Sequence, residues 1–450
     1  MKSNVGELED LATQIIDALR VKVDEAAVKI SRTDTVMIKA ARGKLTVGQS
    51  FEDYEVNLYL AKDRKILVTS FGASSRSQIL EKAVRMVDSL EPSPFYAELP
   101  TPTGKSGEVL DKRIVDSFEG GDYSILAQVL SPDEWGDLSG MAEMAVQTEA
   151  LLLSNGTLLT SARTWFDGYA RIFKGEVSGQ WSWVSTRLDL DLSSQALEKA
   201  RELAEICASL PKEYPPTGPS RLLLSPMVSG NLLEIVASST LASSVLLGFS
   251  MFRQDEIGEK VAGDALTIRS TPLDEELPGY STYDDEGIQT RNIDVIKDGI
   301  LKTFLHNTKT ARIMKAETTG NAGWVFPKLF NLEILTGSMR DGELMDALED
   351  GVYLTNNWYT RLQNYLEGRF STVLRDAVIH VSGGKPKSCI PGYKLRLEGS
   401  LRGLIAGVVE AGMTQNNIMW WEVGTPTKLP HLLIVARDDI SLRKASDNHS

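Results

Sequence analysis

The sequence predicts an α+β protein of two domains, an N-terminal α/β-layered domain and a C-terminal sheet-rich domain whose sheet is curved or barrel-like. A chain of 450 residues is long for a single hydrophobic core. Helical and strand patterns alternate through residues 1–210, whereas strand and turn patterns prevail over residues 221–450. Residues 211–220 between them are rich in proline, which favours an extended linker.

The N-terminal domain is predicted to begin with a helix, because four apolar residues recur at helical spacing: Leu8, Leu11, Ile15 and Leu19. Two short segments that follow, AAVKIS and TVMIKAARG, predict strands separated by a polar break. The next segment, NLYLAKDRKILVTS, predicts two strands around a charged turn at residues 62–64. A second amphipathic helix is expected over residues 79–90, with Ser77 as its N-cap.

The rest of this domain is predicted to contain a hairpin and a third helix. Prolines in EPSPFYAELPTPTG end the first unit, and Asn155-Gly156 is a hairpin-turn sequence within LLLSNGTLLTSARTW. Strand patterns then continue to about residue 190. One face of the following helix carries five apolar residues: Leu197, Ala200, Leu203, Ala204 and Cys207.

The C-terminal domain is predicted to begin with a short buried strand, RLLLSP, and a helix over residues 227–245 that carries Glu234. A strand over residues 288–296 leads into a hairpin turn at residues 297–299, which is followed by the strand ILKTFLHN. The last segment, DDISLRKASDNHS, is expected to be a frayed tail.

The composition excludes several classes of function. The 48 basic and 61 acidic residues give a net charge of −13 without a basic stripe, which disfavours direct binding to nucleic acid. No run of about 18 uncharged apolar residues occurs, so a membrane-spanning helix is not expected. The first residues lack the apolar core of a signal peptide, which makes a cytoplasmic location the expectation.

The two cysteines, Cys207 and Cys389, occur in no paired spacing. Cys207 lies on the apolar face of a predicted helix. We therefore expect a buried thiol there rather than a disulfide framework or a metal site.

The usual residues of a self-contained catalytic site are missing from the sequence. Its four histidines, His306, His380, His431 and His449, form no pair at the helical spacing of a metallohydrolase. A G-x-S-x-G nucleophile motif and a phosphate-binding loop are also absent. The acidic segment 284–286 has carboxylates that could bind a cation, but it lacks the alternating spacing of a calcium loop, so a turn is the simpler interpretation.

Several segments follow one another in a fixed order along the chain: RLLLSP, a helix rich in small residues, GFSMF, IGEKVAGDALTI, YDDEGIQTRNIDVIKDGILKTFLHNTKTA and TTGNA. DDEG followed by the hairpin I-x-x-G-x-L is the most specific of them. This order resembles the TldD/PmbA family, historically called modulators of DNA gyrase, over nearly the whole chain. The stretch DGVYLTNNWYTRLQNYLEGRFSTVLRDAV is similar to its archaeal TldE-like branch.

In that family, TldD carries a helix motif H-E-x-x-x-H, and a cysteine near the C-terminus completes its metal site. TldE is the paralogous partner without the motif. Aligned without gaps, Glu234 falls on the first histidine, Ile235 on the glutamate and Ser239 on the second histidine. The region GMTQNNIMWWEVGTPT, where the cysteine belongs, contains none. The resemblance therefore implies no catalytic residue, no metal ligand and no cofactor in this chain, and zinc in a TldD-type partner.

The function that the resemblance implies is that of a TldE-type pseudoenzyme subunit in a cytosolic TldD–TldE metalloprotease, which degrades or processes small or unfolded peptides. The subunit would stabilise TldD and enclose the proteolytic cavity. The alternative is a homo-oligomeric peptide-binding protein, so the partner is either a TldD-type chain or a second copy. A third interpretation is a stand-alone hydrolase that uses Ser238, Ser239 or the acidic segment.

Two groups of residues are candidates for a cleft or a subunit interface. The first is the acidic segment Asp284, Asp285 and Glu286. The second comprises aromatic side chains that are equally consistent with ordinary core: Trp358, Tyr359 and Tyr365. Peptides are expected to bind by strand addition to the sheet-rich half. Any link to gyrase is expected to be indirect, because the chain is acidic.

Overall fold

The computed structural model describes residues 2–72 and 76–445, whose strands form three sheets. One sheet is built from residues 25–185, and two sheets are built from residues 221–444. The α+β class is therefore confirmed. Among the described strands, the order in each sheet ends at separate edges, so the sheets are open rather than closed into a barrel.

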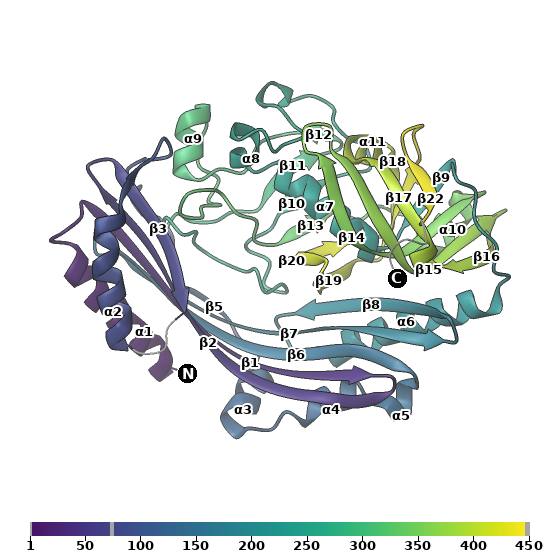
Figure 1. Cartoon of the computed structure of the whole chain (residues 1–450), viewed down its shortest axis with the longest axis horizontal. Helices are drawn as coiled ribbons and strands as arrows, with labels where there is room; N and C mark the ends of the chain where they lie inside the picture. Colours follow the sequence, from purple (N-terminus) through teal and green to yellow (C-terminus); the bar gives the residue numbers. More distant parts are fainter. Residues whose placement is uncertain (1, 73–75, 446–450) are drawn as a thin grey trace.

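The N-terminal sheet curves along the left side and the base of the molecule (Figure 1). Its strand order is β4-β3-β2-β1-β6-β7-β5, and β8 also pairs with β7. Every pairing is antiparallel except β5 with β7, which is parallel. The strands are β1 (Glu25–Ala41), β2 (Lys44–Lys62), β3 (Lys65–Gly72), β4 (Glu91–Pro92), β5 (Gly107–Val109), β6 (Leu138–Leu153), β7 (Leu158–Lys174) and β8 (Val177–Ser185).

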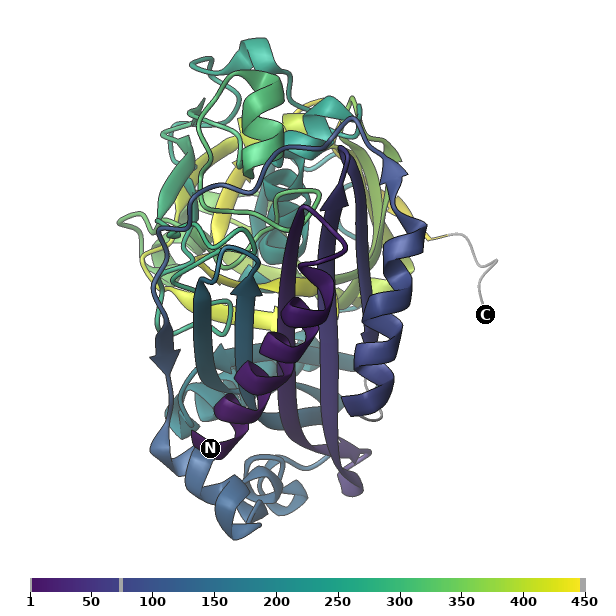
Figure 2. The ribbon, with the colours of Figure 1, turned by 90° about the vertical axis from the view of Figure 1, so that its left-hand side faces the viewer.

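Six α-helices accompany this sheet: α1 (Lys2–Leu19), α2 (Arg76–Arg85), α3 (Lys112–Gly120), α4 (Ser124–Val129), α5 (Pro132–Trp135) and α6 (Leu190–Ser209). Helices α1 and α2 lie side by side on one face of it (Figure 2). The predicted apolar faces of α1 and α6 are confirmed, because their members are all buried. Asp189 caps α6, since its carboxylate accepts a hydrogen bond from the Leu192 N–H at 2.9 Å.

Two expectations for this half are wrong. The two predicted strands around residue 32 are one strand, β1, because β2 and β6 pair with it through the polar break. There the Arg32 Nη2 donates to the carboxylates of Asp34 and Glu52, at 3.0 and 2.5 Å. Helix α2 begins at Arg76, so Ser77 lies inside it rather than at its N-cap.

The predicted turns of this half are confirmed. Asp63 and Arg64 have φ of 51° and 62°, as a two-residue hairpin turn requires. Gly156 lies with φ of 92° in the loop that joins β6 to β7.

The C-terminal half forms the two remaining sheets. The first is an eight-stranded sheet made of β9 (Arg221–Leu224), β14 (Gly351–Asn364), β15 (Arg369–Ser382), β16 (Lys385–Pro391), β17 (Leu395–Ser400), β18 (Val408–Ala411), β21 (Leu432–Val435) and β22 (Ser441–Lys444). Its strand order is β18-β21-β9-β14-β15-β17-β22, and β16 also pairs with β15. The six-stranded sheet has the order β12-β11-β10-β13-β20-β19; it comprises β10 (Ile268–Ser270), β11 (Ile293–Lys297), β12 (Ile300–Leu301), β13 (Leu332–Ile334), β19 (Asn416–Trp420) and β20 (Val423–Leu429).

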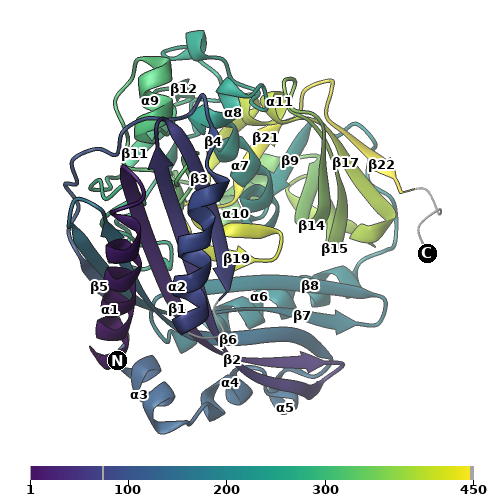
Figure 3. The same cartoon turned by 60° about the vertical axis from the view of Figure 1, so that its left-hand side comes forward.

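Helices of this half are α7 (Pro226–Ser239), α8 (Ala242–Leu246), α9 (Thr308–Met314), α10 (Asp341–Leu348) and α11 (Leu401–Ala406). Short 3-10 helices span Met86–Ser89, Gln254–Glu256 and Gly392–Lys394. Helix α7 packs against β9 and β14 of one sheet and against β19 and β20 of the other, so it lies at the centre of this half (Figure 3).

Four sequence predictions for this half need correction. The strand predicted at ILKTFLHN, residues 300–307, is reduced to β12. The helix predicted over residues 227–245 is interrupted after Ser239, because Leu241 forms a β-bridge with Leu305 before α8 begins. The strand predicted over 288–296 is reduced to β11, at its end. The tail predicted to be frayed forms β22, which pairs with β17; residues 446–450 lie outside the described part.

The two halves have separate sheets but share a hydrophobic core. One continuous cluster joins Trp183 and Leu203 of the first half to Leu222 and Val378 of the second. Residues 211–216 between them have no regular structure, and the division into two domains there stays a prediction. Of the helices in the described residues, none has the length and hydrophobicity that crossing a bilayer requires.

The expectation of a free thiol at Cys207 is wrong. Cys207 and Cys389 are both buried, as an apolar thiol would be, but they form a disulfide with a Cα–Cα distance of 5.2 Å. They are 182 residues apart, so no spacing in the sequence reveals the pair. The packing of α6 against β15 and β16 brings them together. The bond links the two halves across the proline-rich segment.

Candidate functional site

Helix α7 carries the positions that align with the H-E-x-x-x-H motif. Ser225 caps it by accepting a hydrogen bond from the Val228 N–H at 3.3 Å, and Pro226 occupies its first turn. Its residues are buried except Glu234, Ile235 and Ser238, which are partly exposed. These three lie on one stripe, because residues three and four positions apart share a helix face, and Ser238 follows Ile235 by three positions and Glu234 by four. This stripe is where a catalytic group of the helix would meet solvent or substrate.

The carboxylate of Glu234 is fully engaged by the backbone at the start of β20. Its Oε1 accepts hydrogen bonds from the Thr425 N–H at 2.7 Å and the Thr425 hydroxyl at 2.6 Å, and Oε2 accepts one from the Gly424 N–H at 3.1 Å. Glu234 thus fixes α7 to β20. A carboxylate that accepts three such bonds is a structural anchor rather than an available base or ligand.

The other two aligned positions do not fit a zinc site either. Ile235 has no donor atom in its side chain. Ser239 is buried, and its hydroxyl donates to the Ile235 carbonyl at 3.0 Å. Zinc in hydrolases is held by imidazole, thiolate or carboxylate ligands, and this stripe offers none that is free. A serine nucleophile needs a neighbouring base to accept its proton, whereas the Ser239 hydroxyl is turned toward a backbone carbonyl of its own helix.

A buried polar network lies beside the stripe and holds α7 to the β14–β15 hairpin. The Asn231 side-chain oxygen accepts hydrogen bonds from Asn357 at 2.8 Å and Thr360 at 2.6 Å. Its amide donates to the Glu422 carbonyl at 2.6 Å. Asn357 also donates to Thr372 at 3.0 Å. The network fixes the positions of the segments that flank the stripe. No pattern in the sequence indicated this network.

Two strongly exposed aromatic residues flank this network. Tyr359 is 52% exposed and Trp421 is 69% exposed. Tyr359 has a φ of 52°, which is unusual for a residue other than glycine, and its N–H donates to the Glu422 carboxylate at 3.2 Å. The structure therefore brings Glu234 and Tyr359 to the same segment, residues 421–425, which comprises the turn after β19 and the start of β20. Trp358 is half-buried beside Tyr359, with 4.5 Å between the ring centroids, and packs under Arg375.

Tyr365 lies elsewhere, beyond the end of β14. Its ring contacts Phe249 edge-on, with 5.5 Å between the ring centroids. Phe249 and Tyr365 and their chain neighbours Leu247 and Leu366 are large exposed apolar residues, which we call the Phe249 patch: Leu247 (43% exposed), Phe249 (54%), Tyr365 (48%) and Leu366 (64%). Large exposed side chains that gather in this way are typical of interaction surfaces.

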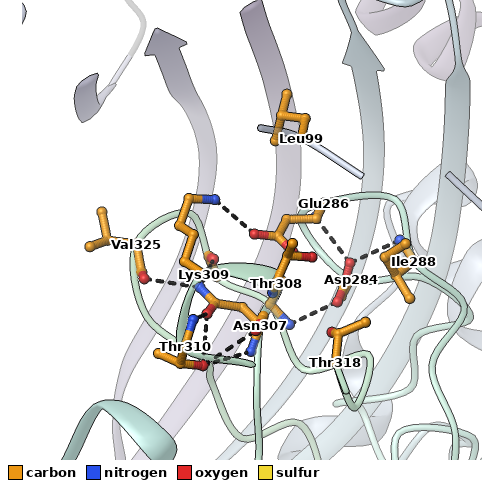
Figure 4. Close-up of polar contacts among 12 residues, drawn as sticks. Leu99, Asp284, Glu286, Ile288, Asn307, Thr308, Lys309, Thr310, Thr318 and Val325 are labelled. Carbon is orange, nitrogen blue, oxygen red and sulfur yellow. Dashed lines mark hydrogen bonds and ion pairs between the residues drawn. The ribbon is translucent and has the colours of Figure 1, made fainter. Parts of the chain in front are cut away.

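The acidic segment 284–286 is buried, and it packs where the two halves meet (Figure 4). Glu286 and Lys309 form an ion pair of 2.7 Å, with side chains 0% and 1% exposed, and the Thr308 N–H donates to the same carboxylate at 2.9 Å. The Lys309 ammonium lies 4.7 Å from the ring centroid of Tyr59, on β2. Asp284 accepts three backbone N–H bonds, yet burial and the neighbouring Glu286 raise its pKa to about 7.

Asp285 connects the segment to the N-terminal sheet. It pairs with Lys29 of β1 at 2.6 Å and with Lys328 at 2.7 Å. Burial favours the neutral carboxyl, but the two ammonium groups outweigh it and lower the pKa of Asp285. The segment is therefore an ion-paired junction within the chain rather than an open cleft. Over residues 2–72 and 76–445, no group of three or more His, Cys, Asp or Glu side chains is placed to hold a metal ion.

Sequence reasoning also missed a group around His431. This buried imidazole lies 3.1 Å from the Tyr353 hydroxyl through Nε2 and 3.5 Å from Asp341 through Nδ1. It lines a cavity of about 180 Å³ together with Trp181 and Lys199. Tyr353 precedes His431 by 78 positions in the chain, and Asp341 precedes both, so no motif reveals the group.

Comparisons with known proteins agree with the family resemblance. Residues 217–438 match the PmbA/TldA metallopeptidase C-terminal domain. A metalloprotease of Methanocaldococcus jannaschii is 31% identical over 182 residues, which cover 36% of this chain and 40% of that protein. Metalloprotease PmbA of Escherichia coli O157:H7 is 23% identical over 349 residues, which cover 71% and 74% of the two chains. The first of these alignments spans well under half of its relative's length.

The fold is shared along the whole chain. The crystal structure of TldE from Thermococcus kodakarensis superposes with a TM-score of 0.80, at 15% identity, over 96% of this chain and 99% of that one. At that identity the superposition establishes the fold, whereas the sequence matches establish descent. The chain belongs to the TldD/PmbA family.

Proposed function

We propose that this chain is the non-catalytic, TldE-type subunit of a TldD–TldE metalloprotease that acts on small or unfolded peptides. The observation that carries the proposal is the exposed stripe of α7. Where the family's metal-binding motif would stand, this stripe presents Glu234, Ile235 and Ser238, and the only carboxylate is held by three hydrogen bonds. The zinc and the catalytic glutamate are then supplied by the TldD-type partner.

The Phe249 patch is the surface that we assign to this partner. It exposes four large apolar side chains on one side of the C-terminal half, and such side chains supply most of the binding energy when they are buried in an interface. Covering them would stabilise both subunits. The same contact would close one wall of the proteolytic cavity, so that only short or extended peptides enter.

Tyr359 and Trp421 are our candidates for peptide contacts. They lie beside the α7 stripe, they are exposed, and the turn between β19 and β20 that carries Trp421 is fixed to α7 through Glu234 and Asn231. Aromatic side chains on a rigid support bind extended peptides with little loss of side-chain entropy. We place the complex in the cytoplasm; the Cys207–Cys389 disulfide would survive reducing conditions there because both sulfurs are buried.

The test is to purify the chain alone and together with a TldD-type chain. We expect a stable mixed complex that contains zinc and cleaves short peptides, while the lone chain contains no stoichiometric zinc and cleaves none. Leu366→Glu should abolish the mixed complex, because it places a charge in the patch. Val21→Glu is the matched control, since Val21 is 81% exposed at a distant turn. Tightly held zinc or peptide cleavage in the lone chain would refute the proposal.

A homo-oligomeric peptide-binding protein is the second candidate. The exposed Tyr359 and Trp421 favour it, because these side chains need no catalytic partner in order to contact a peptide. It predicts that the lone chain binds unfolded peptides with full affinity and does not associate with any TldD-type chain. The co-purification experiment separates the two candidates directly.

A further inference from the structure

A small polar cavity lies where α6 and β8 of the first half meet the C-terminal half. In Figure 1, this helix and this strand lie directly below that half. The first half contributes Gln195 and Lys199, which are four positions apart and therefore share one face of α6. The C-terminal half contributes Asp341, the first residue of α10, together with residues 414–417 and His431. A molecule bound in this cavity would contact both halves of the chain.

The size of the cavity limits what it can hold. Its volume is about 180 Å³, whereas drug-sized ligands occupy about 300–1,000 Å³. It therefore suits a small metabolite rather than a peptide or a nucleotide. None of the residues that line it belongs to the α7 stripe or to the Phe249 patch, so the cavity is separate from the surfaces that the proposed function uses.

Two buried polar atoms at this cavity lack hydrogen bonds. The Asp341 side chain is 43% exposed as a whole, but its Oδ1 is buried, and so is Nδ1 of His431. The two atoms are 3.5 Å apart, which is longer than an ordinary hydrogen bond, and neither has another partner in the described part of the chain. Buried polar atoms without partners are costly. A polar molecule in the cavity could supply the missing bonds.

His431 presents a hydrogen-bond donor to the cavity. Its Nε2 lies 3.1 Å from the buried Tyr353 hydroxyl, which has no other polar partner among residues 2–72 and 76–445. The phenol proton is therefore donated to Nε2, and the imidazole proton stays on Nδ1. Lys199 supplies further donors, because its ammonium has three N–H groups and gives one to Glu202, at 3.1 Å.

Asp341 supplies the opposite charge. The imidazole of His431 lowers the pKa of this carboxyl, and the charge of Lys199 lowers it further, against the opposing effect of burial. Asp341 is therefore ionised at neutral pH. Although Lys199 acts on it electrostatically, no ion pair of the described residues joins the two. The cavity thus holds one anion and one cation that do not neutralise each other by contact.

We propose that this cavity binds a free α-amino acid with a small polar side chain. Its ammonium group would donate to the Asp341 carboxylate, and its carboxylate would accept from the Lys199 ammonium and from Nδ1 of His431. Hydrogen bonds between charged groups are the strong ones, and a zwitterion matches both charges of the lining at once. Gln195 and Asn417 line the cavity with side-chain amides that bond to no other described residue, so they are free to bind the ligand's side chain.

Isothermal titration calorimetry of the lone chain tests the ligand class. The probes are L-serine, L-threonine, L-asparagine and L-glutamine, and we expect at least one of them to bind. The amine that corresponds to the tightest binder lacks the carboxylate, and the deaminated acid lacks the ammonium. Each analogue should bind about tenfold more weakly or worse. Failure of all four amino acids to bind, or an analogue that binds as tightly as its amino acid, would overturn the proposal.

Substitutions in the lining test the location. Asp341→Asn and Lys199→Gln should each weaken binding of the amino acid about tenfold or more, because each removes one charge and keeps the size of the side chain. Asp346→Asn is the matched control, since this exposed aspartate of α10 does not line the cavity. Thermal midpoints without ligand show whether the variants fold. Unchanged affinity in a folded Asp341→Asn or Lys199→Gln chain would refute the site. The assay needs no TldD-type chain, so its failure leaves the proposed function unaffected.

Discussion

Breaking the Cys207–Cys389 disulfide should lower the free energy of unfolding by about 5 kcal/mol, which follows from the 182-residue separation of the two cysteines. The bond restricts the unfolded chain, and the entropy that it removes grows with the logarithm of the closed loop. Both sulfurs are fully buried between α6 and β16, so two reduced thiols would remain packed in the folded state. The effect should therefore arise in the unfolded state.

Denaturant unfolding followed by circular dichroism measures this effect. The midpoint should fall when a reductant is added to the unfolding reaction, and the thermal midpoint should fall by about 5 °C for a chain of this length. The double variant Cys207→Ala/Cys389→Ala is the control: it should start from a lower midpoint and should not respond to the reductant. Single variants leave one buried thiol and should resemble the double variant.

Counting thiols gives the sharpest refutation. In denaturant without a reductant, the native protein should show no free thiol, since its two cysteines are bonded to each other. Two reactive thiols per chain would show that the bond does not form. A midpoint unaffected by full reduction would show that the cross-link does not restrict the unfolded ensemble, and the reasoning from loop length would then fail.

Three further predictions concern groups in other parts of the fold. Glu234→Ala should leave the peptidase activity of the mixed complex within about twofold of the unmodified complex. It should lower the free energy of unfolding by about 1 kcal/mol, because hydrogen bonds to Gly424 and Thr425 are lost. An activity loss as large as that from removing a TldD histidine would contradict this prediction. Lys309→Met should cost about 3–5 kcal/mol, since it leaves Glu286 charged and buried without its cation, and adding Glu286→Gln should recover much of the loss in chemical denaturation. Burial and then the adjacent Glu143 raise the pKa of the Asp167 carboxyl in the folded protein well above its usual value. The free energy of unfolding is therefore highest below the unfolded pKa of Asp167, and it falls as the pH rises through the folded pKa. Asp167→Asn should therefore raise the unfolding free energy at pH 8 and change it little at pH 3, as measured by denaturant unfolding at the two pH values, and equal effects at both would refute the assignment.

The candidate site was only partly predictable from the sequence. The motif alignment placed Glu234, Ile235 and Ser239 on one helix, and it showed that no histidine or cysteine stands there. It could not show that the Glu234 carboxylate bonds to Thr425, because that contact joins residues 191 positions apart. The same limit applies to Asn231, whose partners lie on β14 and beyond β19.

The acidic segment shows how a motif can be found and its role still missed. Its three carboxylates suggested a cation site or a turn. Asp285 and Glu286 pair with lysines from three separate stretches of the chain, Lys29, Lys309 and Lys328, and these pairs make the segment an ion-paired junction. Charge alone did not reveal this, since neutralisation of a buried carboxylate depends on which cations the fold brings within hydrogen-bond distance.

The sequence by itself determined the α+β class, the buried faces of α1 and α6, the hairpin turns and the family, because these depend on residue type and on spacings within one element. Tertiary structure alone decided the continuous β1, the Cys207–Cys389 bond and the ion-paired junction. Each of these depends on contacts between residues far apart in the chain, and local periodicity carries no information about which distant segments come to lie side by side.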